Sequence, residues 1–486
     1  MSQEKKSTAC VYITTTLPYV NAEPHLGHAL EFVRADIIAR WKKSEGHEVF
    51  FNTGTDEHGQ KLFEAAEKAG KPVKQYVDEN AEHFKALLPA LGISSDIHFI
   101  RTTDTHHEQA AQAFWKLVDK NGYIYKKNYK TKYCVGCEEE KTDSELVDGR
   151  CPVHTNRELE IIEEENYFFK FSAFGDKLLA LYEKNPDMVV PASRLNEMRE
   201  FAKRGLEDFS ISRLKSKMSW GIPVPGDSEH VMYVWFDALV NYISTLGWPS
   251  DTKQFEKFWK EGTTIQYCGK DNTRFQSAMW QAMLIAAGLP STRHIIINGF
   301  VTGDGGVKMS KSLGNVVHPQ DLVREYGTDA LRYFVSREIR SFEDSPFTLG
   351  RFKLAYNSEL ANGLGNLVSR IMKMVVSYDV AYEIPKGENP IVSAYRPLLD
   401  AFQIDNASDI IFAKIKELDG FIQKEAPFKK IKVDEAQAKK DVAFLATELY
   451  RIGEALAPFM PVTSQVICDL VQNKQTPDKP LFERKI

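Results

Sequence analysis

The amino-acid sequence predicts an α/β protein in which a parallel sheet is interrupted by an insertion and followed by a C-terminal bundle of helices. Three observations predict this fold. The chain begins with a strand, helix, strand pattern; its middle carries clustered cysteines and short aromatic segments; beyond about Leu349, strand signals give way to long helical patterns. Because a chain of 486 residues rarely forms a single core, two or three domains are expected.

The first predicted elements are a strand, a crossover helix and a second strand. Residues 10–16 are β-branched and aromatic, which favours a strand. Apolar residues then recur at helical spacing from Leu30 to Trp41, and Gly46 ends the helix. Residues 48–52 resume as a strand. Two strands joined by a helix predict a parallel sheet with helices on its faces.

Changes in sequence texture predict the domain boundaries. Between residue 122 and about residue 227 the chain carries a cysteine cluster and short aromatic strands, which indicates an insertion. Strand and helix patterns return at residues 231–235, 264–267 and 294–298, and the C-terminal helices break near residues 385–390 and 458–461. We therefore predict a first α/β half over 1–121, an insertion over 122–228, a second half over 229–300, a linking segment over 301–350 and a helical domain over 351–486.

Composition and charge restrict the class of protein. The chain has 62 Lys and Arg against 67 Asp and Glu, so its formal charge is −5 and any basic surface must be local. No apolar run approaches the ~20 residues that cross a bilayer, and residues 1–8 lack the apolar stretch of a signal peptide. Six cysteines in so long a chain do not form a disulfide scaffold. We expect a cytoplasmic protein with no membrane partner.

Four residues of the predicted insertion have the spacing of a metal site. Cys134 and Cys137 are separated by two residues, as are Cys151 and His154, and thirteen residues lie between the two pairs. This pattern predicts one closed, structural zinc knuckle; the alternative is a set of unrelated thiols in a reducing cell. The remaining cysteines, Cys10, Cys268 and Cys468, lack partner spacing and are predicted to be small buried apolar side chains.

Two histidines mark the turn from the first strand into the first helix. His25 and His28 are three residues apart at the predicted helix start, so they share one face. The helix N-terminus offers N–H groups and positive potential that suit phosphate, and Gly27 allows a nucleotide to approach closely. The alternatives are a metal-binding or purely structural histidine pair.

A second motif follows a late strand. The glycine-rich residues 303–306 precede Lys308-Met-Ser-Lys-Ser312. Glycines allow this loop to move, and Lys308 and Lys311 are point charges able to follow migrating phosphates. Taken by itself, the segment fits a solvated basic loop, which is the correct interpretation for most Lys-x-x-Lys pairs.

Together the two motifs resemble the signatures of class I aminoacyl-tRNA synthetases, whose Rossmann-like catalytic domain holds ATP between them. Over nearly the whole chain, the sequence is similar to methionyl-tRNA synthetases in particular. The matching stretches are Thr16-Leu-Pro-Tyr19, Thr53-Gly-Thr-Asp-Glu-His-Gly59, Ile211-Ser-Arg213, Trp220-Gly-Ile-Pro-Val-Pro225, Tyr233-Val-Trp-Phe-Asp-Ala238, Gly269-Lys-Asp271 and Asn298-Gly-Phe300. The resemblance implies ligation of methionine to tRNA(Met) in two steps, with ATP and Mg²⁺, and makes 351–486 an anticodon-binding domain.

The resemblance also implies a methionine site. Asp56 corresponds to the residue that pairs with the substrate ammonium, and the other implied lining residues are Leu17, Tyr19, Trp235, Ala238, Tyr242, Gln276 and Trp280. Carboxylate and aromatic groups suit an amino acid with a thioether side chain. The family usually has histidine where this chain has Gln276, which keeps a donor and an acceptor but cannot become charged. Without the resemblance, Asp56 fits a helix cap and Trp235 a core residue.

The remaining implied residues contact ATP and tRNA. The resemblance assigns His25 and His28 to phosphate oxygens of the transition state, Lys308 and Lys311 to the departing pyrophosphate, and Gly269 and Asp271 to the ribose. Asn362, Asn366 and Arg370 are spaced by four, which by itself indicates an ordinary polar helix face. In the family, this helix reads the CAU anticodon, and Phe428 stands near the position of a base-stacking aromatic residue.

Three other functions are consistent with parts of the sequence. They are a catalytically silent RNA-binding relative, a nucleotidylyltransferase acting on a small metabolite, and a class I synthetase with another amino-acid specificity. The first should have lost a signature, and the second needs no helix like that of Asn362 to Arg370. The third is the more serious alternative, because Gln276 changes one wall of the implied pocket. Because the chain ends soon after the helical domain, we expect a monomer.

Overall fold

A computed structural model describes residues 9–306 and 317–485. The chain divides into two compact units. The first unit contains residues up to Pro24, Gly46–Leu87 and Ser95–Asn298, and the second contains His25–Glu45, Leu88–Ser94 and residues from Gly299 onward. Each unit therefore combines segments that are distant in the sequence. Among the described helices, none has the length and apolar character needed to span a membrane.

The first unit is built on a six-stranded sheet whose neighbouring strands are all parallel. Its order is β3-β2-β1-β12-β13-β7, with β1 Cys10–Thr14, β2 Glu48–Thr55, β3 His98–Arg101, β7 Val189–Val190, β12 Thr263–Gly269 and β13 His294–Asn298. The predicted strands over residues 10–16, 48–52, 264–267 and 294–298 are confirmed, whereas β3 and β7 were not predicted. Strand order reverses between β1 and β12, and ligands of open parallel sheets bind at the carboxyl ends of strands at such a point.

Several helices of the first unit pack into one aromatic core with this sheet: α4 Thr105–Lys120, α5 Gly175–Lys184, α6 Ala192–Lys203, α7 Val234–Ala238, α8 Asn241–Ser244 and α9 Trp280–Ala287. The unit also contains α2 Gln60–Lys68 and most of α3 Val73–Ala90. Helix α4 buries Phe114 and Trp115, which contact Phe236 of α7 at ring-centroid distances of 5.9 and 5.2 Å. The same core includes Trp280 of α9. These contacts hold the short helix α7 in place.

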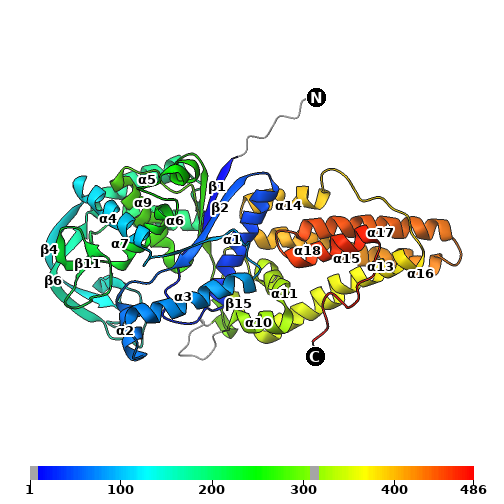
Figure 1. The fold of residues 1–486 in the computed structure, drawn as a ribbon, viewed down its shortest axis with the longest axis horizontal. Helices are drawn as coiled ribbons and strands as arrows, with labels where there is room; N and C mark the ends of the chain where they lie inside the picture. The colour runs from blue at the N-terminus through cyan, green and yellow to red at the C-terminus, as the bar shows by residue number, and fades with distance from the viewer. Residues whose placement is uncertain (1–8, 307–316, 486) are drawn as a thin grey trace, which may run out of the picture. The chain divides into compact units, whose positions relative to one another are not determined.

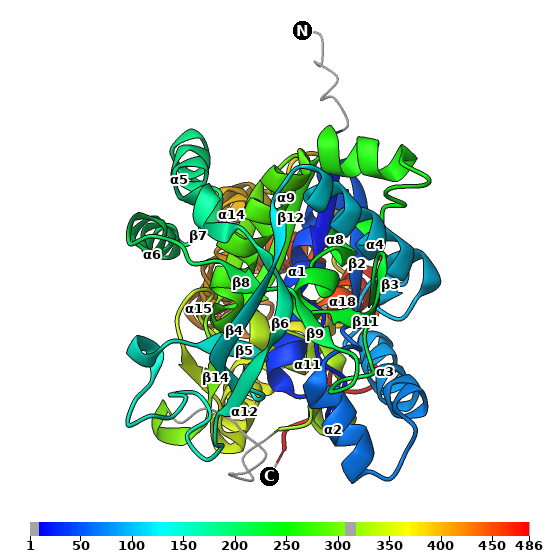
Figure 2. The same ribbon diagram turned by 90° about the vertical axis from the view of Figure 1, so that its left-hand side faces the viewer.

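Two antiparallel sheets lie in the segment that the sequence predicted as an insertion, which also contains α5, α6 and the parallel strand β7. The larger sheet has the order β5-β4-β6-β8, with β4 Ile124–Cys134, β5 Glu139–Lys141, β6 Glu160–Phe169 and β8 Phe209–Ser210. Its long hairpin strands β4 and β6 are labelled in Figure 2. The smaller sheet has the order β10-β11-β9, with β9 Ser212–Leu214, β10 Pro223–Val224 and β11 Asp227–Met232. The strand signal at residues 231–235 thus ends an antiparallel strand and continues into α7, rather than adding to the parallel sheet.

The second unit contains helix α1, two short strands and the C-terminal helices. Its described elements are α1 Leu26–Ser44, β14 Val301–Thr302, α10 Pro319–Tyr326, α11 Thr328–Tyr333, β15 Ser345–Pro346, α12 Leu349–Ala355, a π-helical stretch Tyr356–Gly365, α13 Asn366–Ser377, α14 Pro390–Asp400, α15 Ile404–Glu425, α16 Pro427–Lys430, α17 Glu435–Leu456 and α18 Pro461–Asn473. Helices α13, α15, α17 and α18 lie side by side (Figure 1). The expected breaks near residues 385–390 and 458–461 separate α13 from α14 and α17 from α18.

A buried ion pair fastens α1 within the second unit. Nη2 of Arg332 lies 2.8 Å from Oδ2 of Asp36, and both side chains are fully buried. The Arg332 guanidinium also donates to the carbonyls of Pro458 and Phe459, just before α18. Burial alone would raise the pKa of Asp36, but the positive charges of Arg332 and Arg40 hold it below its ordinary value. The carboxylate is therefore ionised and paired in the folded protein.

Replacing Asp36 with Asn is expected to lower the free energy of unfolding by about 3–5 kcal/mol at pH 7, because it leaves the Arg332 charge buried without its partner. A depressed folded-state pKa stabilises above the unfolded value and loses that effect as pH falls through the folded value. The two proteins should therefore approach each other in stability at acid pH. Urea unfolding checks this, with the exposed pair of Asp321 and Arg324 as control: Asp321→Asn should change stability little. An Asp36→Asn protein as stable as the control would contradict the assignment.

Candidate active site

The carboxyl ends of β1 and β2 bring several predicted site residues together in the first unit. Beyond β1, the segment of Leu17 and Tyr19 continues beside β2: the backbone N–H of Asp56 donates to Pro18 at 3.0 Å, and that of Val20 donates to Asp56 at 3.4 Å. On the other side, the N–H of Thr16 donates to Tyr267 of β12 at 3.1 Å. The backbone thus holds Leu17, Tyr19 and Asp56 at the point where the strand order reverses.

The Asp56 side chain is buried among other acidic groups. Its exposed fraction is 2%, and its Oδ1 accepts no hydrogen bond within the described part of the chain. Burial, followed by the nearby Asp237 carboxylate, raises the pKa of Asp56 well above its ordinary value. A hydrogen bond from the backbone N–H of His58 lowers this pKa and opposes part of the shift. A cation beside Asp56 would relieve both effects, so this position favours a positively charged ligand group.

The aromatic residues predicted for the same site are also connected. The Trp235 ring lies 6.2 Å from Tyr19 in an edge-on arrangement and stacks on Phe275 at 3.8 Å. Trp235 and Ala238 both belong to α7. Phe275 was not predicted as a site residue, although it directly precedes Gln276 in the sequence. Rings meeting at these distances form an apolar wall that begins at Tyr19, whose backbone pairs with that of Asp56.

Gln276 is placed against Tyr242 by a direct hydrogen bond. Its Nε2 donates to the Tyr242 hydroxyl at 2.6 Å, and both side chains are buried. The Tyr242 ring in turn lies 6.0 Å from Trp280. The amide therefore makes a neutral contact at the position where related proteins were expected to have histidine, and the wall is polar there without carrying a charge.

His25 and His28 begin helix α1 in the second unit. His25 is the N-cap, and its Nδ1 accepts from the N–H of Gly27 at 3.1 Å, while the N–H of His25 donates to Nδ1 of His28 at 3.2 Å. The rings stack at 3.8 Å. Burial and then the neighbouring His25 lower the pKa of His28 well below its ordinary value. Because Nδ1 of His28 is an acceptor, the neutral ring carries its proton on Nε2, which makes Nε2–H a donor.

Gly27 is suited to this arrangement by its lack of a side chain. A Cβ at this position would lie 3.0 Å from Cε1 and 3.1 Å from Nδ1 of His25. A larger residue would therefore press on the ring that caps the helix. The local geometry explains why a glycine stands between the two histidines.

The predicted ribose and pyrophosphate residues follow β12 and β14. Gly269 is the last residue of β12 and Asp271 lies in the following turn with an exposed side chain. Lys308 and Lys311 lie outside the described residues.

Cys134, Cys137, Cys151 and His154 converge in the first unit as the sequence spacing predicted. Their ligand atoms all lie within 4.8 Å of one another. Sγ of Cys137 is 3.5 Å from Sγ of Cys151 and 3.2 Å from Nδ1 of His154, and Sγ of Cys134 is 3.7 Å from the same nitrogen. Ligands about 2.0–2.3 Å from a tetrahedral ion are separated by about 3.3–3.8 Å. The four side chains therefore form a group that could hold a metal ion.

The local backbone positions these four ligands. Cys137 donates its N–H to the carbonyl of Cys134 at 3.1 Å, and His154 donates to Cys151 at the same distance, so each pair sits on a tight turn. A Cβ at Gly136 would lie 2.6 Å from the His154 ring, which packs directly on the turn. Only glycine fits beneath the imidazole there.

The predicted anticodon residues lie in the second unit on a continuous helical segment. Asn362 belongs to the π-helical stretch, and Asn366 and Arg370 belong to α13. Both asparagines are exposed, whereas Arg370 is half-buried and its Nη1 lies 2.5 Å from Oδ1 of Asp419 on α15. Phe428 lies in α16 and is 44% exposed.

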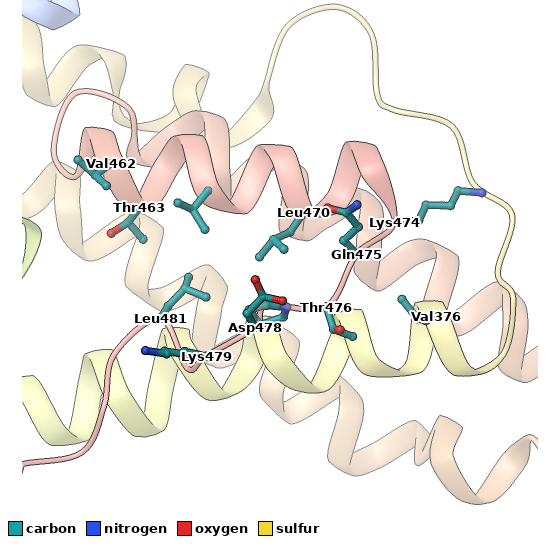
Figure 3. Close-up of a pocket in the computed structure, with 12 residues that line it drawn as sticks. Val376, Val462, Thr463, Leu470, Lys474, Gln475, Thr476, Asp478, Lys479 and Leu481 are labelled. Carbon is teal, nitrogen blue, oxygen red and sulfur yellow. The ribbon is translucent and has the colours of Figure 1, made fainter.

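The second unit contains a groove that is lined by other residues. It is formed by α13, α18 and the segment that follows α18, with Val376, Val462, Leu470 and Leu481 among its side chains (Figure 3). None of the described residues that the sequence predicted for a site lines this groove.

Comparisons with known proteins agree with this arrangement. The family model described as tRNA synthetases class I (M) matches residues 11–161 and 154–372. A methionine–tRNA ligase of Caldanaerobacter subterraneus subsp. tengcongensis is 42% identical over 93% of this chain and 72% of its own length. The corresponding ligase of Streptomyces coelicolor is 40% identical over 96% of this chain and 90% of its own length.

A solved structure extends the similarity to three dimensions. The Mycobacterium tuberculosis methionyl-tRNA synthetase in complex with methionyl-adenylate has a TM-score of 0.89 and 34% identity, covering 98% of each chain. The fold, the family model and relatives matched over nearly the whole chain lead to one conclusion. The chain belongs to the methionine–tRNA ligase family of class I tRNA synthetases, and it is a ligase that activates methionine and attaches it to tRNA.

Proposed function

We propose that Asp56 binds the ammonium group of methionine and that Leu17, Tyr19, Trp235, Ala238, Tyr242, Gln276 and Trp280 line the pocket for its side chain. The observation that carries this proposal is the buried Asp56 carboxylate, whose pKa is raised by burial and by the nearby Asp237 carboxylate. An ammonium ion would hold Asp56 ionised. The stacked rings of Trp235 and Phe275 offer polarizable contact to a thioether.

Activation of methionine then occurs at phosphorus. A carboxylate oxygen of methionine attacks the α-phosphorus of ATP in line; the new O–P bond forms as the bond to pyrophosphate breaks, giving methionyl-adenylate. His25 and His28 donate from Nε2–H to phosphate oxygens, and Gly27 lets the nucleotide approach. Gly269 and Asp271 contact the ribose, and Lys308 and Lys311 follow the departing pyrophosphate. Mg²⁺ accompanies ATP, held mainly by its phosphates.

Transfer to tRNA needs no protein nucleophile. The 2′-hydroxyl of the terminal adenosine of tRNA(Met) attacks the adenylate carbonyl, and AMP leaves as the ester forms. Charging of a tRNA transcript with labelled methionine tests this proposal. We expect a methionyl ester on a transcript with a CAU anticodon and far less on one with the anticodon changed. Equal charging of both transcripts would contradict the tRNA(Met) assignment.

The metal in the cluster of Cys134, Cys137, Cys151 and His154 is proposed to be a structural zinc ion, because the donors are three thiolates and one imidazole with no open position. Zinc held by these residues would fix the turn between β4 and β5 and would take no part in a reaction step. Thiolate ligands of this kind must remain reduced, which supports a cytoplasmic location.

Replacing Cys151 with Ala is expected to remove most of the bound zinc and loosen residues 122–228, while the affinity for ATP changes little. Loss of one of four ligands weakens the site, and the segment it closes then unfolds more readily. Metal analysis and limited proteolysis measure the two effects. Cys468→Ala, in the second unit, serves as the control and should keep the zinc. Wild-type zinc content and aminoacylation in Cys151→Ala would show that the knuckle is assigned wrongly.

The exposed residues Asn362 and Asn366 and the half-buried Arg370 are proposed to contact the anticodon, with Phe428 stacking on a base. Amide and guanidinium groups suit the edges of splayed bases, and the half-exposed Phe428 ring offers a free face. Arg370 already pairs with Asp419, so RNA binding would exchange that partner or share it. Residues 351–486, predicted from the sequence as one helical domain, are proposed to be the anticodon-binding domain.

Phe428→Ala is expected to raise the KM for tRNA by about 5- to 100-fold, because stacking of a base on an aromatic ring contributes about 1–3 kcal/mol. Methionine-dependent pyrophosphate exchange, which needs no tRNA, should stay unchanged. A matched control is Phe444→Ala, since Phe444 is 41% exposed on α17. Equal changes in the KM for tRNA in both variants would contradict a stacking role for Phe428.

A further inference from the structure

Three buried ionisable side chains of the first unit meet next in sequence to residues proposed for the methionine pocket. Nδ1 of His58 lies 3.3 Å from Oδ2 of Asp237, and Nε2 of His107 lies 4.0 Å from Oδ1 of the same carboxylate. The second nitrogen of His107, Nδ1, lies 2.9 Å from the Ser244 hydroxyl. All three ionisable side chains are at most 4% exposed. The mechanism proposed above uses none of them.

His58 and Asp237 shift each other's pKa in opposite directions. Burial alone would lower the pKa of His58, but the Asp237 carboxylate, followed by Glu108 and Glu57, raises it above its ordinary value. Burial would raise the pKa of Asp237, yet His58 and His107 hold it below its ordinary value. Nδ1 of His58 lies 3.3 Å from Oδ2 of Asp237, and the two pKa directions favour an imidazolium paired with a carboxylate inside the first unit, where desolvation makes charges costly.

The ion pair joins the two segments that carry the proposed methionine residues. Asp237 lies in α7 between Trp235 and Ala238, so the position of its carboxylate fixes the position of both neighbours. His58 lies two residues after Asp56, and its backbone N–H donates to the Asp56 carboxylate. One residue therefore holds Asp56 through its backbone and α7 through its ring.

A second contact holds the same loop. The indole N–H of Trp220 donates to the backbone carbonyl of Glu57 at 2.6 Å, and the Trp220 ring lies 5.7 Å from the His58 ring. With its neighbours held by Trp220 and Asp237, the loop of Asp56 to His58 has little freedom to move relative to α7.

We propose that His58 and Asp237 are positioning residues for methionine: their ion pair sets the separation between the Asp56 carboxylate and the α7 residues Trp235 and Ala238. The proposal rests on the proposed function of those three residues. It predicts a specific loss of methionine binding, since a displacement of about 1 Å in a site can reduce its effectiveness by up to about 10²-fold.

The test compares KM for methionine and for ATP in pyrophosphate exchange for His58→Gln, Asp237→Asn and the double variant. We expect each single variant to raise KM for methionine by about tenfold or more, with KM for ATP within about twofold of the wild-type value. The double variant should be no worse than the more impaired single variant, because both changes break the same contact. Additive effects, or equal increases for methionine and ATP, would overturn the proposal.

A matched control separates positioning from general stabilisation. His230 is also buried, and its Nδ1 lies 3.0 Å from Oδ2 of Asp227 in the small antiparallel sheet. His230→Gln should lower stability without changing KM for methionine. An increase in KM for methionine in His230→Gln equal to that in His58→Gln would count against the proposal.

Asp237→Glu keeps both charges and lengthens the side chain by one methylene, so it tests the proposal even where removal of a charge prevents folding. A folded Asp237→Glu protein should have a raised KM for methionine, and a wild-type value would overturn the proposal, as would unfolding of all the pair variants. The two levels of inference remain distinguishable. Absence of methionine-dependent exchange in the wild-type chain would reject the proposed function, whereas exchange that is insensitive to His58 rejects only the positioning role.

Discussion

Asp56→Asn is expected to lower kcat/KM for methionine in pyrophosphate exchange by about 10²- to 10³-fold, while KM for ATP stays near the wild-type value. The neutral amide cannot pair with the substrate ammonium, and loss of one partner of a buried charge pair costs about 3–4 kcal/mol. The exchange assay at varied methionine concentration measures the effect. Asp208→Asn is the control, because Asp208 accepts hydrogen bonds from Tyr125 and Ser172 in the same unit without contacting the pocket residues.

The same substitution should leave the free protein as stable as the wild type or more stable. The pKa of Asp56 in the folded protein lies above its unfolded value, so the wild type loses stability as pH rises from the unfolded value towards the folded value. Asparagine removes this loss. Urea unfolding at pH 7 checks the sign. A marked loss of stability in Asp56→Asn would indicate a structural role instead of a binding role.

Lys311→Ala is expected to slow adenylate formation by about 10²- to 10³-fold, with little change in methionine affinity. The lysine ammonium is assigned to charge that develops on the departing pyrophosphate, and removal of one group that stabilises such charge typically has an effect of this size. Single-turnover formation of methionyl-adenylate measures the rate directly, and equilibrium binding measures the affinity.

Lys116→Ala provides the matched control for this substitution, since Lys116 is an exposed lysine on α4. It should leave both measurements unchanged. Wild-type adenylate formation in Lys311→Ala, or a loss of methionine affinity as large as the loss of rate, would remove Lys311 from the chemical step.

The strands with strong local signals were predictable, whereas the shortest strands were not. Residues 10–14 and 294–298 are β-branched or apolar over several positions, and both segments form parallel strands. Strand β7 is only Val189–Val190, and its pairing with β13 depends on a tertiary contact that no local pattern records. The opposite charges of β4 and β6 are consistent with the pairing of these two strands: Lys130 lies opposite Glu163, and their side chains approach to 2.9 Å.

In the candidate site, too, local arrangements were predictable from the sequence and long-range contacts were not. The convergence of Cys134, Cys137, Cys151 and His154 was predictable because each pair is local and its spacing fixes the turn. The association of His58 with Asp237 was not, since these residues are far apart in the sequence and each has an ordinary local context. Their proximity follows from the packing of α7 beside the loop after β2, which depends on the whole first unit.

The central claim is that this chain activates methionine with ATP. Its most direct test is amino-acid-dependent exchange of labelled pyrophosphate into ATP, measured separately with methionine, leucine, isoleucine and cysteine. We predict exchange with methionine at a kcat/KM far above that for the other three amino acids. Exchange without a preference for methionine, or no exchange with any of the four, would contradict the claim.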